Sequence, residues 1–167
     1  MKGRSIRIAI LGVVAGGALL AGVAIPLYWK SLREARQRGC QGNLMQLWKL
    51  QWINKAQFSG RKPFIRAQGK EFWRALSTIS PPLIEPRDDD VYGCPVRAAR
   101  IRGEIQFLGP ARDVNHLAEG DAVGCDEAFN HGPDDREGGN ILRKSGDIQS
   151  LTGPEWLRFI ETRHCVP

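Results

Sequence analysis

The chain has 167 residues, of which 42% are apolar and five are tryptophan, so it can form one packed domain and a short additional segment. Its net charge of +6 lies wholly in residues 1–38, and the rest of the chain is neutral. Nucleic-acid binding needs a basic face on the folded domain, so this distribution argues against a nucleic-acid partner. The basic residues instead flank an apolar run, where anionic lipid headgroups are the nearer partner.

The apolar run spans residues 8–28 and contains no charged side chain. At a rise of about 1.5 Å per residue, a helix of this length crosses the ~30 Å hydrocarbon core of a bilayer. We therefore expect a membrane as a partner, with a single transmembrane helix. Small residues in such a helix let a neighbouring helix approach closely, and here these are Gly12, Ala15, Gly16, Gly17, Ala21 and Gly22.

The same helix is expected to run from Ile6 to about Ile53, because the polar stretch after the apolar run is rich in good helix formers. Pro26 is expected to kink the helix without ending it. Apolar residues then recur at helical spacing, which predicts that the second half packs on a core. The expected domains are a leader with a transmembrane helix, 1–30, and a globular domain, 31–167.

A secretory signal peptide is the alternative for the N-terminal segment. The basic leader Met1–Arg7 and the apolar run have its outline, and Gly22–Ala24 has the small residues of a cleavage site. The run is longer than a usual signal core and the pattern stays helical past this site, which favours retention.

Short elements follow in the remainder of the chain. Apolar spacing predicts a helix over Gly69–Ile79, and alternation predicts a strand over Ile101–Leu108. Ala122–Cys125 is a further short apolar run, and residues 140–151 read as a hairpin around a glycine-containing turn. A capping-box pattern at Thr152–Glu155 begins a closing helix. The expected fold is α+β, with the long N-terminal helix packed on a small antiparallel sheet.

Four widely spaced cysteines form no C-x-x-C pair and no zinc-ligand pattern. Two disulfides in an oxidising compartment fit best, with three connectivities open, and four buried free thiols in a cytosolic domain are the alternative. Disulfides would place the C-terminal domain outside the cytoplasm. The candidates are Cys40, Cys94, Cys125 and Cys165.

A catalytic interpretation would pair His131 with Asp126 or Asp147 and use Cys125 as the nucleophile. We favour the alternative in which the histidine bonds within its loop and the cysteine is oxidised. No serine-nucleophile motif or phosphate-binding loop is present. We therefore expect no catalytic residue and no cofactor.

Two acidic runs, Asp88–Asp90 and Asp134–Asp135, contain oxygen ligands of the kind that calcium prefers. Neither run has the spacing of an established calcium loop. Solvated acidic turns are the favoured interpretation, so we expect no metal site.

Several segments resemble the type IV pilin-like and type II secretion pseudopilin-like proteins, in particular the prepilin-like group that ends in an H-x9-D-G motif. They look like, in order, the family's helix exit, its C-x-x-N-L-x-Q-L segment, its Y-x-C-P element and its terminal histidine-to-hairpin motif. These segments are Pro26–Arg36, Cys40–Leu47, Tyr92–Pro95, and Asn130–His131 with Gly138–Ile148.

The resemblance implies a non-enzymatic structural subunit of a pilus-like or secretion-associated assembly. Such a subunit is a single-pass protein of the bacterial cell envelope, with its C-terminal domain outside the cytoplasm and other pilin-like subunits as partners. It also implies that Cys40 pairs with Cys94, which leaves Cys125 with Cys165.

The sequence departs from the family at three places. Gly3 is not followed by the usual prepilin cleavage site, and the glutamate expected near the start of the apolar run is absent. Within the terminal motif, residues 133–137 are additional, and Ser145–Asp147 stands where the family has D-G-H. These departures favour a minor subunit or a stand-alone anchored relative over a major fibre subunit. A secreted or anchored ligand-binding module, or a hydrolase, is the alternative function.

Overall fold

A computed structural model describes residues 2–57, 63–95, 103–128, 130 and 138–167, with side chains for all of these except 2–15, 33 and 36. The chain divides into two compact units, Met1–Arg36 and Gln37–Pro167. The first unit is helical throughout its described residues, and the second contains all the strands that the structure describes. The hydrophobic core lies in the second unit.

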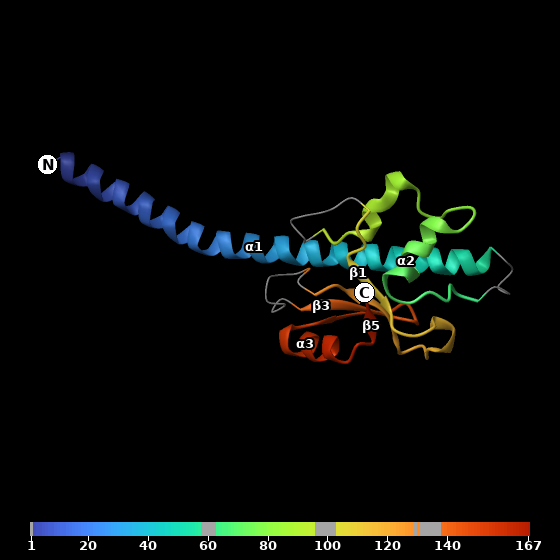
Figure 1. Ribbon diagram of the computed structural model, residues 1–167. Coiled ribbons are helices and arrows are strands. Elements are labelled where there is room, and N and C mark those ends of the chain that lie inside the picture. Colours follow the sequence, from blue (N-terminus) through green and yellow to red (C-terminus); the bar gives the residue numbers. More distant parts are fainter. Residues whose placement is uncertain (1, 58–62, 96–102, 129, 131–137) are drawn as a thin grey trace. The chain divides into compact units, whose positions relative to one another are not determined.

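Helix α1 runs from Lys2 to Ala56 and continues through Pro26 (Figure 1). This confirms the expected long N-terminal helix. Residues 16–31 of α1 are exposed within the chain. Over the side chains that the structure describes, no helix combines the length and the apolar character needed to cross a membrane; residues 8–15 of the expected span lie outside those side chains.

The second half of α1 carries a buried stripe, as the helical spacing predicts. Its buried members are spaced three or four residues apart, so they share one face of the helix. The stripe consists of Cys40, Leu44, Leu47, Trp48, Gln51 and Asn54. Trp52 lies at its edge and is 44% exposed, with its ring 4.9 Å from that of Phe64.

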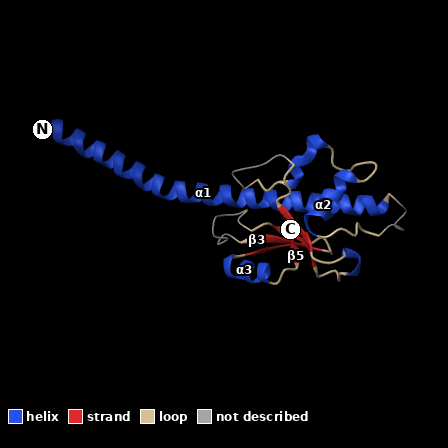
Figure 2. Ribbon diagram, viewed as in Figure 1, coloured by secondary structure: helices blue, strands red, loops and turns tan. Residues whose placement is uncertain are grey.

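The sheet has five strands in the order β4-β3-β2-β1-β5, and all neighbouring pairs are antiparallel (Figure 2). The α+β prediction is thereby confirmed. Strands β3 and β4 form the expected hairpin, in which Gly146 adopts a φ of +94° that favours glycine. The strands are β1 Phe107–Pro110, β2 Ala122–Asp126, β3 Gly139–Arg143, β4 Ile148–Leu151 and β5 Cys165–Val166.

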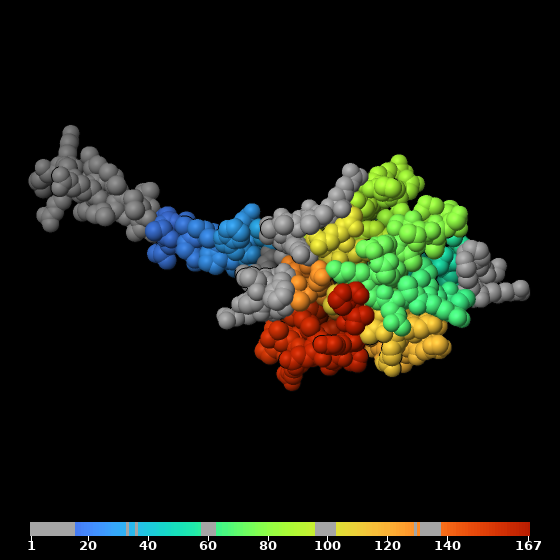
Figure 3. All heavy atoms as spheres, viewed as in Figure 1, coloured from blue at the N-terminus to red at the C-terminus, as the bar shows by residue number. Residues whose placement is uncertain are grey.

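Helices cover both faces of the sheet. Helix α2, Gly69–Thr78, and the buried half of α1 share one core cluster with Phe107 and Val123. Helix α3, Gly153–Glu161, packs on the other face, where Trp156 contacts a separate cluster. In Figure 3 the red C-terminal residues adjoin the green surface that includes α2, consistent with the contacts between α2 and β5. Two 3-10 helices complete the described elements: η1, Pro86–Tyr92, and η2, Val114–His116.

The predicted strand over Ile101–Leu108 is wrong in its position. Residues 101–102 lie outside the described residues, 103–106 are not strand, and β1 begins only at Phe107. The reason is Gln106, which alternation placed on the polar face. It is fully buried, and its backbone N–H donates to the Tyr92 carbonyl at 2.9 Å. This segment therefore bonds to the last residue of η1 instead of extending the strand.

The capping box at the start of α3 is also not formed. Thr152 is the N-cap residue, but its side chain caps no backbone N–H. Its hydroxyl donates instead to the Glu155 carboxylate at 3.3 Å. The predicted helix is present, with Pro154 in its first turn.

Candidate functional site

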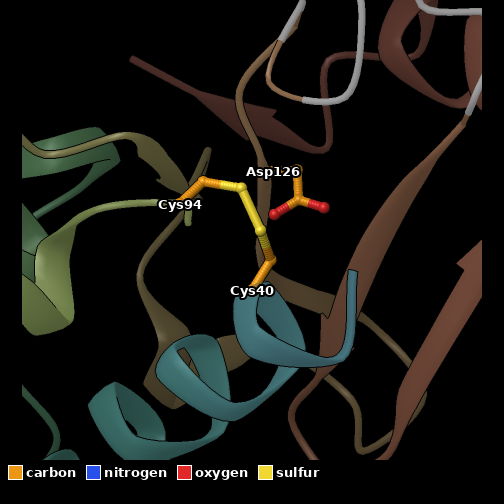
Figure 4. A group of neighbouring side chains, drawn as sticks. All are labelled: Cys40, Cys94 and Asp126. Carbon is orange, nitrogen blue, oxygen red and sulfur yellow. A yellow bond between two sulfur atoms is a disulfide. The ribbon is translucent and has the colours of Figure 1, made fainter. Parts of the chain in front are cut away.

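A disulfide fixes the buried half of α1 to the middle of the chain. Cys40 and Cys94 are joined with an S–S distance of 2.02 Å and a Cα–Cα distance of 5.0 Å (Figure 4). Cys40 is the first fully buried residue of α1 among its described side chains, and Cys94 lies two residues after η1. This is the pairing that the pilin resemblance implies.

Contacts on either side of the disulfide hold the same two segments together. The Asn43 side-chain amide donates to the Gly93 carbonyl at 2.8 Å. At Gly39, a Cβ would come within 3.0 Å of the Pro95 ring, so this position suits a glycine. Close approach, a hydrogen bond and a covalent bond therefore act within about one turn of α1.

The carboxylate of Asp126 lies beside the disulfide and is turned toward it (Figure 4). One of its oxygens and the sulfur atoms of Cys40 and Cys94 all lie within 4.8 Å of one another, and all three residues are buried. Its Oδ2 accepts two hydrogen bonds of 2.8 Å, from the backbone N–H and the side-chain amide of Asn140. These bonds offset part of the cost of burying a polar group.

The Asn140 side chain extends this network to α1. The Gln41 side-chain amide donates to Asn140 Oδ1 at 3.1 Å and to the Ser150 hydroxyl oxygen at 2.7 Å. The Ser150 hydroxyl in turn donates to Asn140 Oδ1 at 2.8 Å. Residues from α1, β2, β3 and β4 are thus joined by polar contacts next to the disulfide.

Two cysteines and a carboxylate are potential ligands of a metal such as zinc. Among the residues that the structure describes, this is the only cluster of three or more such side chains close enough to share an ion. A thiolate is the form that binds metal, and the sulfur atoms of Cys40 and Cys94 are bonded to each other instead. The arrangement is therefore that of a structural junction.

The expected second disulfide is not present in this structure. Cys125 on β2 and Cys165 on β5 are free and buried. Burial raises the pKa of the Cys125 thiol well above its usual value, and Cys165 and Asp126 raise it further. A neutral, buried thiol is a poor nucleophile.

The structure brings together little of the expected catalytic group. His131 lies outside the described residues. Asp147 is at the hairpin turn, where its carboxylate accepts a hydrogen bond from the Ser145 hydroxyl at 2.7 Å. Asp126, by contrast, points toward the Cys40–Cys94 disulfide.

Of the two acidic runs that could supply calcium ligands, the structure describes only one. Asp134 and Asp135 lie outside the described residues. Asp88–Asp90 belongs to η1, where Arg87 lies 3.8 Å from the Asp88 carboxylate. The described part of this run contains no cluster with the geometry of a shared cation.

The small residues expected to pack against another helix are partly described. Gly12 and Ala15 lie outside the described side chains. A Cβ added at Gly16, Gly17 or Gly22 would meet no described atom of this chain within 4 Å. Ala21 is likewise exposed. This stretch of the helix surface is open to a neighbour.

Sequence reasoning missed the role of Asp126. The residue closes a short apolar run, and no local pattern distinguishes it from an ordinary polar strand end. Comparisons of the chain with protein-family models, curated proteins and solved structures give no match.

Proposed function

We propose that the protein is a non-enzymatic, membrane-anchored, pilin-like structural subunit of a pilus-like or secretion-associated assembly in the bacterial cell envelope. The observation that carries this proposal is the contrast along α1. Residues 16–31 are exposed, whereas the stripe that begins at Cys40 is buried in the sheet domain. The second half of the helix therefore packs on its own domain, and an earlier part of the helix is open to its surroundings.

The exposed part of α1 needs a partner. Leu19 and Leu20 are 73% and 75% exposed, and Val23 and Leu27 are also open. Full burial of each such side chain is favourable by roughly 1.5–3 kcal/mol of transfer free energy. Several of them together therefore strongly favour an apolar environment around this part of α1. Lipid and the equivalent helix of a neighbouring subunit both provide that environment.

The disulfide supports the location of the domain. Disulfides persist in oxidising compartments, and Cys40–Cys94 is both formed and buried. We infer that the C-terminal domain lies outside the cytoplasm and that the basic N-terminus lies inside it.

Crosslinking in membranes tests the assembly. The double variant Gly16→Leu/Gly17→Leu adds bulk where the helix surface is open, and it should abolish crosslinked oligomers because close backbone approach is lost. Gly42→Leu is the matched control, since Gly42 is exposed and a Cβ there also meets nothing within 4 Å. Unchanged crosslinking of the double variant, at equal protein levels, would refute the proposed packing.

The alternative is a secreted or anchored ligand-binding module or hydrolase, and in its secreted form the apolar run is a signal peptide. Its hydrolase form loses support because Cys125 is a buried thiol of raised pKa. Intact mass of the mature protein from native membranes separates the anchored subunit from the secreted form. Retention of residues 1–24 supports the anchored subunit, and their loss supports the secreted domain.

A further inference from the structure

A pocket of about 330 Å³ lies on the sheet domain, and none of the residues at the disulfide junction lines it. Three segments form it: the residues after β1, those just before β2, and the link between α3 and β5. Its polar lining is Arg112, Asp121, Thr162, Arg163 and His164, with Leu117 beside them. Donor groups from distant parts of the sequence thus converge on one hollow.

The pocket lining carries an excess of positive charge, with two guanidinium groups against one carboxylate. Among the described residues, neither guanidinium group has an ion-pair or hydrogen-bond partner, and Arg112 and Arg163 are both exposed. The one carboxylate in the lining is Asp121, whose Oδ2 already accepts a hydrogen bond from the Ala118 N–H at 2.9 Å. The guanidinium groups remain available to a ligand.

The backbone at Arg163 is the second observation. Arg163 has a φ of +51°, and it is the only non-glycine residue with a positive φ in the described part of the chain. It directly follows Thr162, the C-cap of α3, and its N–H donates to the Ile160 carbonyl at 3.1 Å. Glycine is the usual residue at this left-handed position after a helix, so an arginine here carries a conformational cost. Such a cost points to a use for the side chain.

We propose that this pocket binds the phosphate group of a small phosphorylated molecule. Planar guanidinium groups donate paired hydrogen bonds to phosphate oxygens, and two of them match its charge. The imidazole of His164 adds a further donor, and the volume leaves room for a small organic part beside the phosphate. The pocket lies wholly within Gln37–Pro167, so this binding is independent of how α1 is anchored.

Calorimetric titration of the full chain in a nonionic detergent tests the proposal. The probes are inorganic phosphate and glycerol 3-phosphate, at constant ionic strength. Arg112→Gln and Arg163→Gly should each weaken binding by roughly tenfold or more, because each removes charged hydrogen bonds to the ligand. Arg158→Gln is the matched control, since Arg158 is an exposed residue of α3 outside the pocket lining.

Arg163→Gly also separates binding from folding. Glycine adopts a positive φ at little cost, so this variant should melt at the same temperature as the original chain or higher while losing affinity. Tighter binding of glycerol 3-phosphate than of phosphate would support an organic ligand, and equal affinities would support the phosphate group alone as the recognised part. The proposal is overturned if neither probe binds at millimolar concentration, or if all variants bind as the original chain does.

Discussion

Removing the Cys40–Cys94 disulfide should destabilise the sheet domain substantially. The double variant Cys40→Ala/Cys94→Ala removes the covalent link and leaves no unpaired thiol at the junction. The bridged residues are 54 apart in the sequence. For a closed loop of this size, the chain-entropy relation gives a loss of about 4 kcal/mol at 25 °C. Since small domains are stable by roughly 5–15 kcal/mol, this is a large fraction of the total.

Urea unfolding of the full chain in a nonionic detergent measures the loss. Tryptophan fluorescence reports on the sheet domain, because Trp48, Trp73 and Trp156 are buried in its two clusters. Reductant should lower the stability of the original chain to about that of the variant, and it should leave the variant unchanged. A difference below about 1 kcal/mol between oxidised chain and variant would refute the chain-entropy reasoning.

Two further outcomes follow from the packing of β2 and of its neighbours. Gly124→Ala should lower the free energy of unfolding by about 1–3 kcal/mol, because a Cβ there lies 2.5 Å from the Trp73 ring. Gly120→Ala is the control and should be nearly neutral, since a Cβ there meets nothing within 4 Å. Equal effects of the two substitutions would contradict this packing. Cys125 and Cys165 should resist iodoacetamide in the folded chain and react after denaturation, as mass spectrometry would show, since both are buried thiols. Rapid labelling of the folded chain would show that they are accessible.

The elements that the sequence predicted well are those fixed by local pattern. Helix α2 was expected over Gly69–Ile79 and is found over Gly69–Thr78, because Phe72, Trp73 and Leu76 repeat at helical spacing and are buried. The β3–β4 hairpin was expected for a similar reason. Its turn needs a positive φ, and Gly146 supplies it.

The prediction failed where a distant segment decides the structure. Gln106 looks like a solvent-facing strand residue, yet its Oε1 accepts a hydrogen bond from the Cys94 N–H at 2.9 Å. Its carbonyl also accepts from the Asn130 side-chain amide at 2.7 Å. Partners 12 and 24 residues away leave no trace in a local alternation pattern. The same holds for Asp126, whose place beside the disulfide depends on how β2 meets α1.

The position of the disulfide along α1 also bears on the proposed function. A force applied to the exposed part of a helix first reaches the contact nearest that part, and noncovalent contacts then separate one after another. Cys40 is the first fully buried residue among the described side chains of α1. The Cys40–Cys94 disulfide therefore lies where the helix would begin to separate from the domain under such a force. The bonds of Gln41 to Asn140 and of Asn43 to Gly93 follow within one turn. A load along α1 would therefore pass to the sheet and to the loop after η1 before it reached Leu44, Leu47 and Trp48, an arrangement that suits the proposed anchoring through this helix.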